Sequence, residues 1–132
     1  MYRIKYLLLA ALLTCPLPSL GAGGGSAPTP YFNIATPFVV NLADKEDLVF
    51  LQVNAQFKVP SEELKPHLTT HMPAIQHTMM LVLSQQTTKD IKTVAGKEKL
   101  RATALKAIQD LLKEQVGDPI IEEVYFTGFI IQ

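Results

Sequence analysis

Three histidines come nearest, in type and spacing, to a metal-binding or catalytic site in this sequence. His67 and His71 are four residues apart, so on a helix their imidazoles would share a face, as two ligands of a zinc site must. His77 falls at a different helical angle, no third ligand accompanies the pair, and Pro73 would disturb this turn. We therefore expect ordinary surface or boundary histidines, and a metal-dependent enzyme is the last of three functional hypotheses.

The other common signatures of catalysis are absent from the sequence. It contains no glycine-rich phosphate loop, no cysteine-rich metal set and no recognisable nucleophile motif. The adjacent carboxylates Glu62–Glu63 and Glu122–Glu123 would not face each other on a helix, and on a strand they would point to opposite faces. We expect them to be solvated. The sequence favours a protein that binds other proteins over an enzyme, and it predicts no cofactor.

Length and composition indicate a single folded domain. The chain has 132 residues, of which 48% are hydrophobic and 18% charged, as is typical of a globular protein. Its 12 basic and 12 acidic residues balance, and the lysines are interleaved with glutamate and aspartate. Nucleic acid is not an expected partner, because binding through phosphates usually requires a basic face or stripe.

Residues 1–21 have the order of an export signal: basic residues, a short apolar run, then small residues. The apolar run is shorter than the roughly 20 residues that a membrane-spanning helix needs. We expect cleavage after Gly21, with Ala22 as the next candidate, and retention as a short membrane anchor stays open. Residues 22–30 are rich in glycine and proline, which predicts a linker between the signal and the folded domain.

Cys15 is the only cysteine and lies within this signal, so no disulfide is expected in the mature domain. The residues before Cys15 weakly resemble a lipoprotein signal, although Thr14 and Pro16 fit that pattern badly. Loss of the cysteine with the signal is the preferred interpretation. Attachment of a lipid at Cys15 is the alternative.

The first half of the domain predicts two strands. A β-branched run at residues 37–42 precedes a polar turn at residues 43–47 that could close a hairpin. Apolar and polar side chains then alternate over residues 51–59, the period of a half-buried strand, and Pro60 ends the pattern. The polar members of this alternation are Gln52, Asn54, Gln56 and Lys58.

From Glu62 the apolar residues recur every three or four positions, which predicts a long helix with Ser61 as its N-cap. Pro73 lies several residues inside this helix and should kink it at about His71. After a polar stretch, a second helix is expected from roughly Val94 to Val116, ended by the glycine and proline that follow.

The last predicted element is a strand within residues 120–131. A regular strand would turn three of its apolar side chains one way (Val124, Phe126 and Ile130) and three the other way (Tyr125, Phe129 and Ile131). Apolar character on both faces suggests an inner strand, covered by helices on at least one face. The order β-β-α-α-β predicts an α+β domain, with two helices packed on a small antiparallel or mixed sheet.

Several short segments, in a common order and spacing, carry a resemblance to a known family. They are Tyr31–Phe32, residues 37–42, Pro73–Ala74–Ile75, Leu83–Ser84, Asp90–Ile91, Gly96–Lys97, Leu100–Arg101 and residues 124–132. Over residues 31–132 the sequence resembles the periplasmic domain of FliL, the flagellar basal-body-associated protein.

This resemblance implies a fold similar to stomatin and prohibitin domains, self-association into a ring, and contact with the flagellar stator complex, whose torque output or retention the family supports. It implies a location in the periplasm, at the inner membrane or flagellar basal body, and offers no catalytic residues. Family members typically have a full membrane-spanning helix where this chain has a short apparent signal. Anchoring therefore stays open, and a soluble periplasmic paralogue recruited by a partner is one alternative.

We hypothesise that neighbouring copies pack side by side through their helical faces and an exposed sheet edge, enclosing a periplasmic helix of a stator subunit. The candidate contact residues are Gln52, Asn54, Gln56, Lys58 and Lys106. The competing hypothesis, ranked second, is an exported or lipid-anchored binding protein unrelated to the motor.

Overall fold

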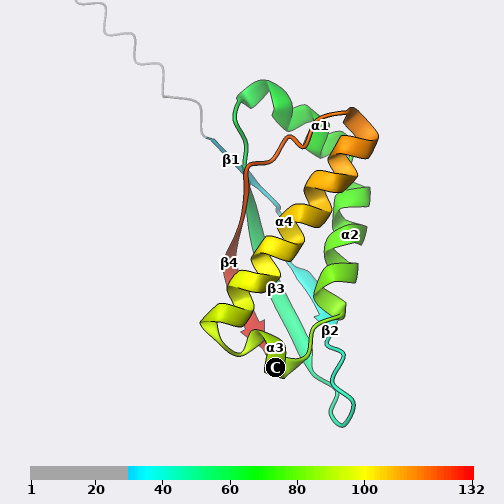
Figure 1. Ribbon diagram of the computed structural model, residues 1–132, viewed down its shortest axis with the longest axis vertical. Helices are drawn as coiled ribbons and strands as arrows, with labels where there is room; N and C mark the ends of the chain where they lie inside the picture. The colour runs from blue at the N-terminus through cyan, green and yellow to red at the C-terminus, as the bar shows by residue number, and fades with distance from the viewer. Residues whose placement is uncertain (1–29) are drawn as a thin grey trace, which may run out of the picture.

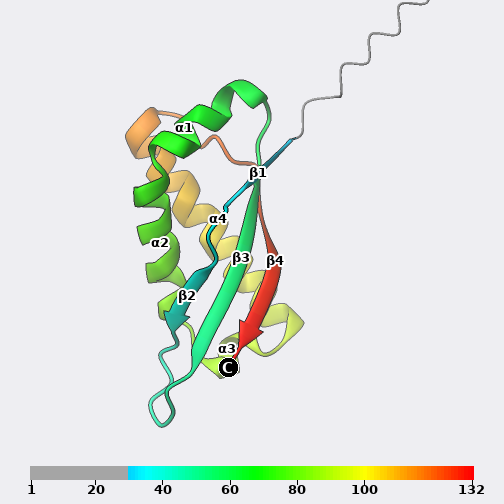
Figure 2. The ribbon, with the colours of Figure 1, turned by 180° about the vertical axis from the view of Figure 1, so that it is seen from behind.

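The computed structural model describes residues 30–132, so the expected signal, most of the expected linker and Cys15 lie outside the described residues. Within residues 30–132, the helices cover one face of an antiparallel sheet and leave the other face uncovered (Figures 1 and 2). The α+β class predicted from the sequence is confirmed. The elements in chain order are β1 (Tyr31–Asn33), β2 (Phe38–Asn41), β3 (Phe50–Lys58), the 3-10 helix η1 (Glu62–Leu64), α1 (Lys65–Thr70), α2 (Met72–Ser84), α3 (Thr88–Ile91), α4 (Val94–Val116) and β4 (Glu123–Ile131).

The sheet is built around β3. Strands β1 and β2 pair with opposite ends of one edge of β3, and β4 pairs with its other edge from Leu51↔Ile131 to Lys58↔Glu123. All of these pairings are antiparallel. The sequence-based prediction that the last strand is an inner one is therefore wrong, because β4 is an edge strand. The apolar residues that the sequence places on both faces of this strand therefore need a different cause.

That cause is a β-bulge in β4. Asn54 is paired with Gly128 and the next residue, Ala55, with Phe126, so Thr127 has no partner on β3. The extra residue reverses the alternation of side chains within β4. Phe129 and Ile131 are consequently turned to the same face as Val124 and Phe126, whereas Ile130 is turned to the opposite face. The facing predicted from a regular strand is wrong for these three residues after the bulge.

The predicted hairpin between β2 and β3 is confirmed, and it is tied to the helical layer. The amide of Leu42 donates to the carbonyl of Val49 at 2.9 Å. Asp44 in the turn accepts two hydrogen bonds from Thr88 at the start of α3, one from the amide at 2.8 Å and one from the hydroxyl at 3.0 Å. These bonds fix the hairpin against the start of α3.

The predicted kink at His71 is also confirmed. The helix is interrupted there between α1 and α2, where His71 has φ −96° and ψ 11°, and Pro73 lies in the first turn of α2. Proline has no amide to donate and is tolerated in a first helical turn, which is why the chain restarts a helix at this point. Ser61 does precede the helical segment, but its side chain makes no capping hydrogen bond.

A short helix, α3, occupies the polar stretch between the two predicted helices and was not expected. It begins with a capping box: the Thr87 hydroxyl accepts from the Asp90 amide, and the Asp90 carboxylate accepts from the Thr87 amide at 3.0 Å. The Asp90 carboxylate also accepts from the Thr87 hydroxyl at 2.6 Å. These hydrogen bonds from Thr87 lower the pKa of Asp90, the side-chain bond having the larger effect.

Replacing Thr87 with alanine is expected to raise the pKa of Asp90 towards its ordinary value, because the hydroxyl that stabilises the charged form is lost. A lowered carboxyl pKa adds stability above the ordinary range of aspartate, and this stability is lost as pH falls through the folded-state pKa. The variant should therefore lose less stability in acid. A pH titration of the Asp90 carboxyl carbon by NMR measures the shift directly. Thr93→Ala, which removes the cap of α4 instead, should leave that titration unchanged.

Helix α4 has the bounds predicted from the sequence. The Thr93 hydroxyl accepts from the Gly96 amide at 3.0 Å at its start, and Gly117, with φ 86°, ends it in the left-handed conformation that glycine adopts without strain. Ile120 also has a positive φ of 58°, which is unusual for a β-branched residue. Its amide donates to the Asp118 carboxylate at 2.7 Å, and its side chain is buried.

The core lies between the sheet and the two long helices. Every buried side chain within residues 30–132 is apolar, and β3 and α4 contribute four each. The central members of the core are Leu51, Val53, Ala55 and Phe57 from β3, Ile75, Met79 and Leu83 from α2, and Leu100, Ala104, Ile108 and Leu112 from α4. Among the helices described, none is long and apolar enough to cross a membrane.

Candidate protein-binding surface

One face of the sheet is not covered by the helices, and we call it the open face. It is seen frontally in Figure 2. Because side chains alternate along a strand, the residues between the buried positions of each strand point to it. Its polar members are Asn33, Asn41, Gln52, Asn54, Gln56 and Lys58, and its apolar members are Tyr31, Val39, Phe50, Tyr125 and Ile130.

Large apolar side chains are concentrated on this face. Val39 and Ile130 are the most exposed of them, at 55% and 51%, and the register places them on either side of Gln52. Phe50, Tyr31 and Tyr125 are also exposed. Single exposed apolar residues need no explanation, but several on one sheet face indicate a binding surface.

The end of the open face near β1 is aromatic and carries an ion pair. Tyr31 and Tyr125 meet edge to face with their ring centroids 6.1 Å apart. Lys58 lies 3.2 Å from the carboxylate of Glu122, and the hydrogen bond to Glu122 raises the pKa of Lys58. Both partners of this pair are well exposed, so its contribution to stability is small. A partner that docks here would meet a face with little net charge.

The structure brings together four of the five contact residues predicted from the sequence. Gln52, Asn54, Gln56 and Lys58 lie in one row along β3 on the open face. Lys106 does not join them, because it lies on α4, and the helices cover the opposite face of the sheet (Figure 1). Its side chain is exposed and pairs with Asp110 one helical turn away at 2.5 Å.

Sequence reasoning missed the apolar half of the open face. The period of β3 identified its polar row, but Tyr31 and Val39 come from two short strands whose pairing no local pattern predicts. Tyr125 and Ile130 share this face only because of the bulge at Thr127. The one available signal was the Val39–Val40 pair, in which one valine had to face away from the core.

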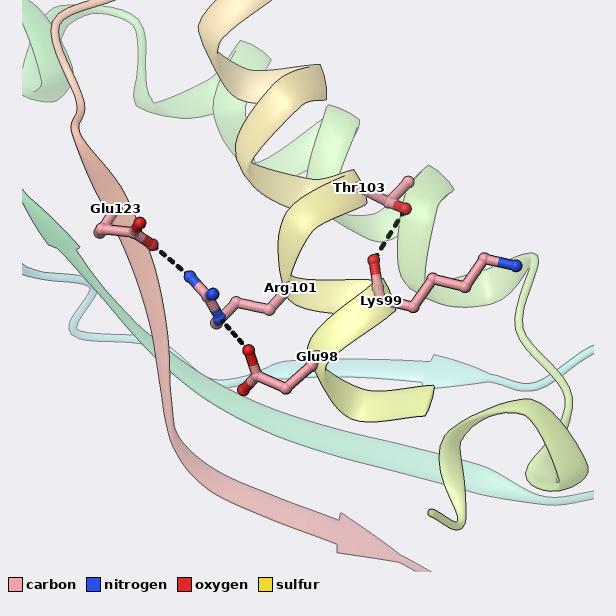
Figure 3. A network of polar contacts seen from close by, with 5 residues as sticks. All are labelled: Glu98, Lys99, Arg101, Thr103 and Glu123. Carbon is pink, nitrogen blue, oxygen red and sulfur yellow. Dashed lines mark hydrogen bonds and ion pairs between the residues drawn. The ribbon is translucent and has the colours of Figure 1, made fainter. Parts of the chain in front are cut away.

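A second surface feature is a groove along the outer edge of β4, with a volume of about 490 Å³. We call it the β4 groove. It is lined by Lys97, Glu98 and Arg101 from α4 and by Glu123, Tyr125, Phe126 and Phe129 from β4. Figure 3 shows how Arg101 links the two elements.

Arg101 links α4 to β4 through Glu123, and it also pairs with Glu98 on its own helix. It lies 3.0 Å from Glu98 one turn earlier on α4, and it also forms an ion pair with Glu123 across the groove (Figure 3). The hydrogen bond to Glu98, followed by the charge of Glu123, raises the pKa of Arg101. Glu123 and Glu122, the adjacent carboxylates noted in the sequence, therefore have different cationic partners.

The histidines do not form a metal site with other residues of the described part of the chain. His67 is exposed on α1, and His71 is half-buried at the kink. No group of three or more histidine, cysteine or acidic side chains between residues 30 and 132 is arranged to hold a metal ion.

Comparison with known proteins accounts for the whole described domain. The family model of the flagellar basal body-associated protein FliL matches residues 31–132. The chain belongs to the FliL family. The family predicted from the sequence is thereby confirmed, and FliL proteins are associated with the flagellar basal body.

Named relatives agree with this assignment. The flagellar protein FliL of Aquifex aeolicus is 32% identical over 101 residues, which cover 76% of this chain and 60% of the Aquifex protein. The flagellar protein FliL of Escherichia coli K12 is 24% identical over 105 residues, which cover 80% of this chain and 67% of the E. coli protein. The matched region thus spans less than two thirds of the Aquifex FliL.

Proposed function

We propose that this FliL family member is a non-catalytic accessory protein of the flagellar motor. In this proposal it contacts the stator complex, supports torque generation or motility, and associates with its own copies into a ring. The observation that carries the proposal is the open face. It presents five exposed apolar side chains beside a row of amides on β3.

The composition of the open face suits a protein partner. Interface centres are enriched in aromatic and other apolar side chains and depleted of charge, with polar groups around them. Here the open face has two apolar groups, each with amide side chains of β3 beside it: Val39, Phe50 and Ile130 at one end, and Tyr31 and Tyr125 at the other. An apolar periplasmic helix of a stator subunit could lie across such a surface, its polar atoms meeting the amides.

Self-association would use other surfaces. The flank of α2 beside β2 exposes Met80 and Leu81 next to His77, and exposed apolar residues of this kind are a candidate contact between copies. The outer face of α4, which carries Lys106, is the candidate opposite contact. Two different surfaces of one chain generate a ring when the rotation closes.

The remaining parts of the proposal rest on family resemblance. A stomatin- or prohibitin-like fold and a periplasmic location at the inner membrane or basal body agree with an exported α+β domain. The alternative function is an exported binding protein, soluble or lipid-anchored at Cys15, whose partner is unrelated to the motor. The same open face would then serve that partner.

Two charge substitutions on the open face test this proposal. Val39→Arg combined with Ile130→Arg should abolish swimming by the source organism while leaving the abundance and unfolding temperature of the protein unchanged, because both side chains are exposed in the free domain. Swimming speed, immunoblotting and thermal unfolding measure these effects. Lys45→Glu, an exposed charge reversal in the turn between β2 and β3, is the matched control and should swim normally.

The charge reversals Lys58→Glu and Lys106→Glu test whether these two residues, predicted from the sequence, contact a partner or another copy of the chain. We expect Lys58→Glu to impair motility, and Lys106→Glu to weaken self-association measured by analytical ultracentrifugation. Normal motility and normal self-association in both variants would count against a role for these residues. Normal swimming of the double arginine variant would count against the open face as the motor contact.

A further inference from the structure

The outer edge of β4 is an unpaired strand edge. Phe50 and Gln132 exchange two backbone hydrogen bonds, at 2.7 and 2.9 Å, which fixes the direction of the backbone groups that precede Gln132. Because these directions alternate along an antiparallel strand, the amides and carbonyls of Ile131 and Phe129 point away from β3. No backbone hydrogen bond from another described element reaches them.

This edge has little of the protection that natural sheets usually give to such strands. Edge strands are commonly blocked by lysine, by proline or by a covering loop. Between Glu123 and Ile131 there is neither lysine nor proline, and the single protective feature is the bulge at Thr127. The stretch from Gly128 to Ile131 beyond the bulge is regular and able to pair with a further strand.

The β4 groove runs beside this free edge. The rings of Phe126 and Phe129 are 5.8 Å apart and form its apolar floor. The first turns of α4 form the opposite wall, from which Arg101 reaches across to Glu123. A strand edge beside a helix, with an apolar floor between them, is the arrangement by which peptide-binding domains take up an extended segment as an additional strand.

The charges in the groove indicate which segment it fits. Arg101 is neutralised by Glu98 and Glu123. Lys97 forms no ion pair with any carboxylate of residues 30–132, and its ammonium lies 5.1 Å from the centroid of the Phe129 ring. It is the one cation of the groove left to pair with a ligand, so an acidic side chain on that ligand would complement it.

We propose that the β4 groove binds an extended segment of a partner protein, with an acidic residue among apolar ones, by addition of a strand to β4. The partner's backbone pairs with Phe129 and Ile131, an apolar side chain lies on Phe126 and Phe129, and the acidic side chain meets Lys97. The site shares only Tyr125 with the open face, and it does not depend on the proposed motor contact.

Peptide titration of the isotope-labelled full chain, followed by NMR, tests this proposal. The probe is a short capped peptide of alternating valine and threonine with one central glutamate. We expect shifts of the Phe129 and Ile131 amides and of Lys97. Two matched peptides serve as controls: one is methylated at alternate backbone nitrogens and should not bind, and one has lysine in place of glutamate and should bind more weakly.

Charge reversal at Lys97 gives a second measurement. Lys97→Glu should weaken binding of the glutamate peptide about fivefold, the equivalent of roughly 1 kcal/mol, and should strengthen binding of the lysine peptide. The proposal is overturned if the methylated peptide binds equally well, if the shifts fall on the open face, or if no peptide binds. It is also overturned if raising the protein concentration alone shifts the Phe129 and Ile131 amides, because a second copy would then occupy the edge.

Discussion

Replacing Gly96 with alanine is expected to lower the free energy of unfolding by about 2 kcal/mol or more. A Cβ at this position would lie 1.7 Å from the carbonyl oxygen of Asp90, and a backbone atom cannot move aside as a flexible side chain can. Alanine ordinarily stabilises a helix by up to about 1 kcal/mol relative to glycine. Overpacking that displaces backbone costs about 1–3 kcal/mol, and a clash this close is at the upper end of that range.

The clash outweighs the helix propensity at Gly96 because α3 and α4 meet there almost without a linker. Chemical denaturation of the variant measures the change. Val94→Ala, in the same turn of α4 but with an exposed side chain, is the matched control and should alter stability by less than about 0.5 kcal/mol. A Gly96→Ala variant as stable as the natural chain would mean that the α3–α4 junction is looser than described.

Phe57→Ala should have the largest effect on stability, a loss of about 3–5 kcal/mol. The ring is fully buried on the central strand, and the register places it between Phe32 of β1 and Val124 of β4. Removing it takes away contacts on both sides of β3 and leaves a cavity that the sheet cannot close. Since this loss is a large part of the stability of a domain of this size, the variant should be scarce in cells.

The neighbouring residue gives an internal comparison for Phe57. Gln56 is on the same strand but points to the open face, so Gln56→Ala should change the free energy of unfolding by less than about 0.5 kcal/mol. Urea denaturation of the two variants measures both changes. Similar losses in the two would contradict the division of β3 into a buried and an open face.

The sequence predicted those elements whose cause is local. The alternation of β3, the bounds of α4 and the interruption at His71 follow from residue period, from Gly117 and from Pro73, each acting within a few residues. Helix α3 was missed because it is short, and its capping box of Thr87 and Asp90 lies in a stretch that is otherwise polar. The edge position of β4 was missed because strand order depends on contacts between distant segments.

The open face likewise contains residues that a local pattern predicts and residues whose positions depend on contacts between distant segments. The polar row on β3 needed only the period of one strand, and its four residues do lie together. The apolar residues beside it come from β1, β2 and β4, and their alignment depends on register and on the bulge at Thr127. Lys106 was a candidate contact on a helical face, and its position relative to that row depends on how α4 packs, which no local pattern predicts.

The central position of β3 also sets the order in which the domain can be completed. One edge of β3 is paired at once through the hairpin with β2, but its other edge pairs with β4, from Leu51↔Ile131 to Lys58↔Glu123, across almost the whole domain. During synthesis that edge must stay open until every helix has been made, and such distant pairing is slow to form. A chain that terminates before Glu123 would leave this edge of β3 unpaired along its full length. We therefore expect such a chain to aggregate and not to form a smaller stable domain.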